Sequence, residues 1–329
     1  QIQALTSSQV QALSSTQLNN VETGQVKNLS SAQVQALTSS QLNVMTSTAL
    51  QALDTVDVQA IGTVVMQSLN SMALNGLAST QIQALTSTQL KALTTAQLNV
   101  LSANAVQALD VDGVNDLSTT QVGALSSTQL NRLTTAQVAG LNTGNLKAIA
   151  TDALQGVSST QLNALSSTQV QALTSAQVQA LTSNQLNSID TTQVVNLSSA
   201  QVQVLSSNQL NALDDAALQA IETADLRAMS TTQIAGLSSV QLNALTSVQL
   251  QALGSGQVMA LTGSQINSLN SNSVTALGSS YIPTLSSSQV SLLSTTQLND
   301  LTSTQIQAMN SSQVQALTST QLNNMATSK

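Results

Sequence analysis

Residues 9–16 read QVQALSST and residues 161–168 read QLNALSST. The same eight-residue pattern runs from Gln1 along the whole chain without an insertion or a deletion, so that 329 residues make 41 octads and one further residue. The second position is Val, Leu, Ile or Met in all 41 octads, and the fifth position is apolar in all 41. Because a fixed period of this kind is the signature of a repeat architecture, it overrides the expectation of about two domains that the length alone would give.

The sixth position of the octad predicts where a helix begins. It holds Ser, Thr, Asp, Asn or Gly in 36 of 41 octads, and these residue types are the favoured N-caps because a short side-chain oxygen can accept a hydrogen bond from a free backbone N–H. Gln holds the first position in 29 of 41 octads, three residues after the sixth position of the preceding octad, which is the spacing of a capping box. The apolar residues before the cap and at the fourth helical position are spaced as a hydrophobic staple. Three signals therefore predict a helix N-terminus in every octad. The octads that lack a favoured cap have Glu22, Ala78, Ala150, Glu222 and Ala326.

One continuous helix is incompatible with the same pattern. Eight residues at about 100° per residue leave about 80° of rotation per octad, so no apolar stripe would persist along such a helix. Each octad is therefore predicted to form one and a half to two turns of helix, followed by a sharp corner. Since helices this short are unstable alone, the sequence predicts an all-α solenoid in which neighbouring octads stabilise one another.

Asn at the third position marks a second period. Asn115 is off this pattern, and without it the gaps between successive Asn are three or four octads, with a mean of about 3.45 octads. We therefore expect about 3.5 short helices per superhelical turn, with Asn on one side, and the cations of this position (Lys27, Lys91, Lys147 and Arg227) on the other. This Asn face is the candidate surface for lateral contacts. Its residues are Asn19, Asn43, Asn75, Asn99, Asn131, Asn163, Asn187, Asn211, Asn243, Asn267, Asn299 and Asn323.

The two periods together predict a narrow rod with a packed interior. About twelve turns that stack at roughly 8–10 Å would give a rod of about 100–120 Å. Positions two and five would fill its axis, and the small Ala at position four would allow close approach. A β-solenoid is the main alternative, because octads rich in Ser and Thr can stack in sheets. A period that is not a whole number of octads and the N-cap residue types both favour helices over strands.

The composition restricts the function. The chain has no His and no Cys, so that imidazole bases, thiolate nucleophiles and the usual zinc and copper sites are excluded. Only six residues are Lys or Arg, which excludes a basic surface for nucleic acid, and no apolar stretch is long enough to span a membrane. We therefore predict that the protein is not an enzyme and has no cofactor or metal site.

One octad departs from the pattern. The segment 278–284 contains Tyr281 and Pro283, which are the only Tyr and the only Pro of the chain. Pro removes a backbone donor and disfavours the preceding helical turn. We expect a frayed or kinked octad here, and the rest of the solenoid to tolerate it.

The octads resemble the Thr- and Gln-rich octapeptide-repeat regions of large secreted bacterial surface and adhesin-type proteins, and the resemblance covers the whole chain. The segment 173–180 is also similar to the opening helix of the repeats of TAL-effector DNA-binding proteins, through Leu173, Thr174, Gln177, Val178 and Ala180. The chain lacks the second helix, the base-reading dipeptide and the cations of that family, so DNA recognition is not implied.

These observations predict that residues 1–329 form a single continuous solenoid of 41 octads with a structural role outside the cell or at its surface. The chain would form a rod, filament, sheath or stalk element, and its partner would be itself, through end-to-end or lateral association. Both ends stop within the pattern, which predicts a segment of a longer protein or a chain that polymerises. The alternative is an adhesin-type or ice-binding module whose repeated polar faces bind surface glycans, other cells or ice.

Overall fold

The computed structural model describes residues 2–325, and the regular secondary structure of these residues is entirely helical. They contain 39 short α-helices and two 3₁₀ helices, with no β-strand among them. The prediction of an all-α fold with one short helix per octad is therefore confirmed, and the β-solenoid alternative is wrong.

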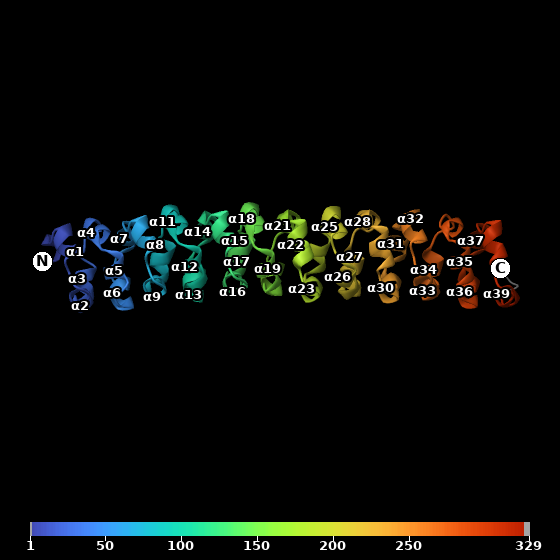
Figure 1. Ribbon diagram of the computed structural model, residues 1–329, viewed down its shortest axis with the longest axis horizontal. Coiled ribbons are helices and arrows are strands. Elements are labelled where there is room, and N and C mark those ends of the chain that lie inside the picture. The colour runs from blue at the N-terminus through green and yellow to red at the C-terminus, as the bar shows by residue number, and fades with distance from the viewer. Residues whose placement is uncertain (1, 326–329) are drawn as a thin grey trace. The chain divides into compact units, whose positions relative to one another are not determined.

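The chain divides into two compact units, Gln1–Leu173 and Thr174–Lys329. Within each unit, the same short helix and corner recur from octad to octad (Figure 1). The helices of the first unit are η1 (Ile2–Ala4), α1 (Ser7–Gln11), α2 (Ser15–Asn20), α3 (Thr23–Val26), α4 (Ser31–Ala36), α5 (Ser39–Leu42), α6 (Ser47–Gln51), α7 (Thr55–Gln59), α8 (Thr63–Gln67), α9 (Ser71–Gly76), α10 (Ser79–Gln83), α11 (Ser87–Ala92), α12 (Thr95–Val100), α13 (Ala103–Ala108), α14 (Val111–Asp116), α15 (Thr119–Gly123), α16 (Ser127–Leu130), α17 (Thr135–Ala139), α18 (Thr143–Ala148), α19 (Thr151–Gln155), α20 (Ser159–Asn163) and α21 (Ser167–Ala172).

The helices of the second unit follow the same plan. They are α22 (Ser175–Ala180), α23 (Ser183–Ser188), α24 (Thr191–Val194), α25 (Ser199–Gln203), α26 (Ser207–Ala212), α27 (Asp215–Ala220), α28 (Thr223–Ala228), α29 (Thr231–Ala235), α30 (Ser239–Ala244), α31 (Ser247–Ala252), α32 (Ser255–Met259), α33 (Gly263–Asn267), α34 (Ser271–Ala276), η2 (Ile282–Thr284), α35 (Ser287–Ser291), α36 (Thr295–Asp300), α37 (Ser303–Gln307), α38 (Ser311–Gln315) and α39 (Ser319–Asn323).

Each helix begins where the sixth octad position predicts. At α11, the Thr86 hydroxyl accepts from the Gln89 N–H at 3.2 Å, and the Thr86 N–H donates to Gln89 Oε1 at 3.0 Å. These two bonds form the predicted capping box. Asp54, before α7, is an exception, because it has the residue type of a cap but makes no side-chain cap bond. Its helix has a second carboxylate, Asp57, where most octads have Gln.

Helices stack on the helices three octads away. In the first unit α1 contacts α4 and α15 contacts α18, and in the second unit α25 contacts α28 and α31 contacts α34. Positions two and five supply the buried core of each unit, as Val58 at position two in the first unit and Leu253 at position five in the second illustrate, both at 0% exposure. Each unit is therefore a solenoid of about 3.5 octads per turn, as the spacing of Asn predicts.

Position four sets how closely the turns approach. A Cβ atom added to Gly140 would lie 2.3 Å from Val111 Cγ1, and one added to Gly156 would lie 2.5 Å from Ser127 Cβ. In both pairs the seventh position of one octad packs against the fourth position of an octad in the next turn. Only small residues fit this contact where the backbones are closest, because a packed interior cannot absorb an extra carbon atom without strain.

Gly140→Ala is therefore expected to destabilise the first unit by about 1–3 kcal/mol, the usual cost of forcing an extra group into a packed contact. The β-branched Val111 cannot move aside easily because its χ1 angle is restricted. Urea unfolding should show the loss, and Val111→Ala in the same chain should restore most of it. Equal stability of Gly140→Ala and the parent chain would contradict the packing described here.

The octad with Pro283 forms the short 3₁₀ helix η2 in place of an α-helix, and Pro283 lies in its first turn. The local irregularity that the sequence predicts is confirmed. Ile282 is still 1% exposed and Leu285 is 5% exposed, so the two apolar positions of this octad remain in the core. The defect changes the helix and leaves the packing in place.

Candidate functional site

A ladder of buried Gln side chains joins successive turns. At α11, Gln89 Nε2 donates to the carbonyl groups of Val58 at 2.8 Å and Ile61 at 2.9 Å, both in the preceding turn. Its Oε1 accepts from the Thr86 N–H of its own helix. Gln89 is 2% exposed, so one buried amide satisfies three backbone groups in two different turns.

The same bonds recur along both units, in most cases from Gln i to the carbonyl groups at i−31 and i−28. We call the Gln residues that make both of them the Gln ladder. It consists of Gln33, Gln41, Gln81, Gln89, Gln97, Gln121, Gln137 and Gln169 in the first unit. In the second unit it includes Gln209, Gln233, Gln249, Gln257, Gln265, Gln297, Gln305, Gln313 and Gln321.

Other residues at this octad position also bond to the preceding turn. The Tyr281 hydroxyl donates to the Gln251 carbonyl at 2.8 Å and so takes over the role of Gln as a donor between turns. Asp57, which is 6% exposed, instead accepts from the Ser31 hydroxyl at 2.7 Å. Tyr281 and Asp57 therefore connect turns from the first octad position, as the Gln residues do.

Asn residues of the predicted Asn face form a second set of hydrogen bonds between turns. Asn19 Nδ2 donates to the Val44 carbonyl at 2.7 Å, and Asn19 Oδ1 accepts from the Thr46 N–H at 2.9 Å. The side chain thereby bridges the end of one helix and the start of the next, one turn away. We call the Asn residues that donate from position i to the carbonyl at i+25 in this way the Asn clamps. They are Asn19, Asn43, Asn75, Asn99, Asn115, Asn131, Asn187, Asn211, Asn243 and Asn299.

Nine of these clamps are predicted members of the Asn face, and Asn115, which breaks the regular spacing, has the same bonds as the others. The predicted positions Asn163, Asn267 and Asn323 lie at the same place in the octad. The structure gives the clamps a role within the chain, between turns. Lateral contact between chains along this face remains a prediction.

Asn clamps serve octads that lack the capping-box Gln. The N–H groups of Thr46, Asn70 and Ser102 donate to Asn clamps, and the residue three positions after each of them is Ala. The caps Asn142, Asp214 and Asn270 also lack that Gln and also donate to a clamp. The Asn of one turn therefore substitutes for the missing Gln of the next. Because an intramolecular hydrogen bond contributes about 0.5–1.5 kcal/mol net, this substitution stabilises the helix start.

Where both amides are present, they compete for one N–H. The Ser126 N–H donates to the clamp Asn99 at 2.8 Å, and Gln129 Oε1, which would otherwise accept it, is buried without a partner. Gln129 keeps its bonds to the preceding turn through Nε2, to the carbonyl groups of Asn99 and Leu101. The Asn clamp and the capping-box Gln are thus alternative acceptors for the same backbone N–H of the cap residue.

Long side chains at the third position make one of the two clamp bonds, the one donated to the carbonyl at i+25. Gln51, Gln59 and Gln203 each donate to the carbonyl at i+25, at 3.0, 2.8 and 2.8 Å. Arg227 Nε makes the same bond to the Ala252 carbonyl at 3.0 Å. Gln and Arg at the third position can therefore act as donors between turns, and Asn adds the acceptor for the next cap.

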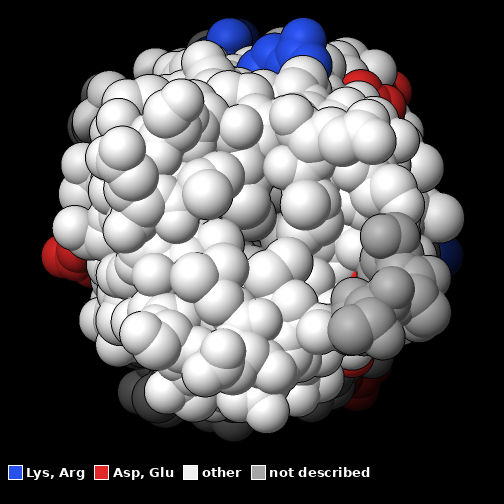
Figure 2. All heavy atoms as spheres, turned by 90° about the vertical axis from the view of Figure 1, so that its right-hand side faces the viewer, with Lys and Arg blue, Asp and Glu red and all other residues white. Residues whose placement is uncertain are grey.

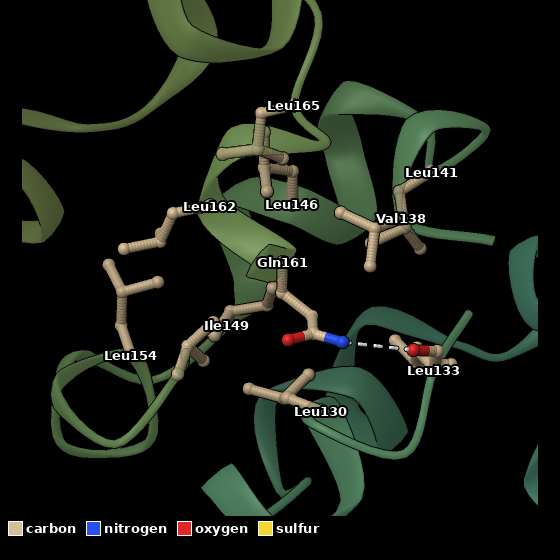
Figure 3. Close-up of a pocket in the computed structure, with 11 residues that line it drawn as sticks. Leu130, Leu133, Val138, Leu141, Leu146, Ile149, Leu154, Gln161, Leu162 and Leu165 are labelled. Atoms are coloured by element: carbon tan, nitrogen blue, oxygen red, sulfur yellow. Dashed lines mark hydrogen bonds between the residues drawn. The ribbon is translucent and has the colours of Figure 1, made fainter. Parts of the chain in front are cut away.

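The core of the first unit contains an apolar cavity of about 30 Å³. Figure 3 shows Leu130, Ile149 and Leu154 around it, with the Gln161 amide between them. Gln161 Nε2 donates to the Leu133 carbonyl at 3.2 Å, so the polar atoms at this cavity are used by the inter-turn bond. An apolar void of this size holds no site for a polar ligand.

Charged groups are sparse. In the view of Figure 2, Lys, Arg, Asp and Glu cover small separate areas, and uncharged residues cover most of the surface. Among residues 2–325, no three His, Cys, Asp or Glu side chains are grouped so that they could hold a metal ion. Within the same described part of the chain, no helix is long and apolar enough to cross a membrane.

Sequence reasoning identifies the Gln of the first position as part of a capping box and does not identify its bonds to the preceding turn. A signal for the clamps is present in the sequence. Asn at position three occurs one superhelical turn before several octads in which the box Gln is missing, namely those of Ala49, Ala73, Ala105 and Ala217. A comparison of octads separated by one superhelical turn could have revealed this compensation.

Three segments of the chain, residues 18–55, 146–183 and 218–255, match the family model of the ALTTAQ repeat. Each matched segment contains several octads. No curated protein matches the chain significantly. The matches identify a repeat family in these segments, and they do not bear on secretion or adhesion.

Proposed function

We propose that the protein is a structural repeat protein that acts as a rod, filament, sheath or stalk element outside the cell or at its surface. One observation carries the proposal: in both units, Gln ladder residues of one turn donate to backbone carbonyl groups of the preceding turn. Such a fold extends by adding turns, because the contacts of each turn are with its neighbours. The proposed role is mechanical and needs no catalytic group.

Self-association is part of this proposal. The low charge leaves little electrostatic repulsion between copies, and the Asn face is our candidate for lateral contact. Sedimentation velocity over a hundred-fold range of protein concentration should show species larger than the monomer. A monomer at every concentration, with binding to cells or ice, would favour the adhesin-type or ice-binding alternative.

The experiment that tests the spacer role is insertion of turns. Seven additional octads copied from residues 79–134 should add about two turns and lengthen the particle by roughly 16–20 Å, since packed helices lie about 8–10 Å apart. Small-angle scattering measures the maximum dimension. A matched insertion of equal length, composed only of Gly and Ser, serves as control. An inserted chain that is no longer than the parent would contradict the proposed role.

The location outside the cell is tested separately. Antibody labelling of intact cells that produce the protein should detect it without permeabilisation. Labelling that requires permeabilisation would contradict the surface location and would leave the structural role unaffected.

A further inference from the structure

A polar cavity of about 200 Å³ opens on the first unit and is lined by residues of three successive turns. Its buried floor includes Leu77 and Ile82, which are 9% and 3% exposed. Its rim is formed by uncharged polar side chains, namely Gln51, Asn75, Ser79, Ser102 and Asn104.

The cavity coincides with two departures from the octad pattern. Ala105 occupies the position of the Gln ladder, and Ala78 occupies a cap position where most octads have Ser or Thr; both residues line the cavity. In other octads of this unit the Gln carboxamide extends from this position to the preceding turn, as Gln81 does to the carbonyl groups of Leu50 and Leu53. With Ala105, the side chain that would extend in this direction is missing.

The register of the Gln ladder identifies the groups that this missing amide would contact. Ladder donors bond to the carbonyl groups at i−31 and i−28, which for position 105 are those of Leu74 and Leu77. The Ser102 N–H, which a Gln would accept, is already bonded to Asn75 Oδ1 at 2.6 Å. The side chain at position 105 therefore supplies no N–H donor to the carbonyl groups of Leu74 and Leu77, and the Ser102 N–H needs no further acceptor.

We propose that this cavity binds a small neutral molecule or side chain that carries a primary carboxamide. An amide NH₂ group supplies the two donors that the Gln ladder supplies elsewhere, and the rim offers further hydrogen-bonding partners of both kinds. A cation is disfavoured because no carboxylate lines the cavity to compensate its desolvation. An anion is disfavoured because it would face carbonyl oxygens.

The amide has two possible sources, a free small molecule or a Gln or Asn side chain of a peptide, and two probes distinguish them. Propionamide represents the free ligand, and N-acetylglutamine methylamide represents the side chain within a peptide. Titration is followed by the ¹H–¹⁵N shifts of Ser79, Ser102 and Ala105. Propionate has nearly the same shape but no N–H donor, so it is the matched control ligand.

We expect saturable shifts at millimolar propionamide, with affinity at least ten-fold lower for propionate. A tighter response to the acetylated Gln derivative would identify a peptide side chain as the source, and a weaker response would identify the free molecule. Ala105→Gln should fold, because Gln is the commonest residue at this position, and should abolish the shifts. Equal responses to propionamide and propionate, an unchanged response in Ala105→Gln, or no response to a large excess of propionamide would overturn the proposal.

Discussion

Simultaneous replacement of Leu165 and Val170 by Ser is expected to unfold the octads of the first unit that pack against them. The two side chains are 8% and 5% exposed and form the staple on either side of one helix start. Truncation of a buried aliphatic residue commonly costs about 2–5 kcal/mol, and Ser also brings a hydroxyl into the core. The loss should exceed about 4 kcal/mol, which is a large part of the stability of a domain.

Hydrogen exchange with detection by mass spectrometry is the appropriate measurement, since a repeat protein can lose one region while the rest stays folded. Peptides around residues 135–173 should exchange fast, and peptides near residues 50–90 should stay protected. Thr168→Ala, a change at an exposed position of the same octad, should leave exchange unaltered. An unchanged melting profile of the double variant would contradict a packed apolar axis.

Gln89→Ala is expected to destabilise the first unit by about 2–4 kcal/mol, because buried backbone groups without partners cost about 1–3 kcal/mol each. The substitution leaves the Thr86 N–H and the carbonyl groups of Val58 and Ile61 without the Gln amide. Urea unfolding of the parent and the variant measures the difference.

The structure also predicts a partial rescue, by Gln59→Asn. Residue 59 precedes Thr86 by the same separation as Asn19 precedes Thr46, and the double variant reproduces the natural set Asn19, Thr46 and Ala49. The new Asn should accept the Thr86 N–H and recover about 1 kcal/mol, the usual net value of a hydrogen bond. Because the bonds to Val58 and Ile61 stay lost, recovery should be incomplete.

Gln59→Asn should stabilise the protein only where Gln89 has been replaced by Ala. In the parent chain, where Gln89 already accepts the Thr86 N–H, Gln59→Asn should be neutral or slightly destabilising. The same effect of Gln59→Asn in both backgrounds would show no coupling between the two sites and would contradict the compensation by Asn clamps.

Local features of the fold follow from the sequence because they depend on neighbouring residues. The start of α11 requires only Thr86, Gln89 and the apolar residues around them, and their spacing is visible in a single octad. The superhelical period is also visible, since Asn recurs every 3 or 4 octads. The close contact of Gly140 with Val111 is harder to predict from the sequence. It joins residues of successive turns and depends on how far each turn rises along the solenoid axis.

The bonds between turns could not be predicted for a related reason. A Gln side chain has a donor and an acceptor end, and the capping box explains only the acceptor. The destination of the donor depends on the register of the turns, which places Val58 and Ile61 beside Gln89. The cavity beside Ala105 arises in the same way, since a missing side chain matters only when its partners in the next turn are known.

Residues separated by one superhelical turn, such as Ile61 and Gln89, lie side by side, and both sets of bonds between turns depend on this stacking. The chain has no Cys, so that Gln59→Cys provides a single site for a nitroxide label at an exposed position. Paramagnetic broadening of amide resonances should be strong at residues 84–90 and at residues 28–34, in addition to the immediate sequence neighbours. Broadening that falls off steadily with distance along the sequence, with no second maximum near these residues, would contradict the stacked turns and the ladders built on them.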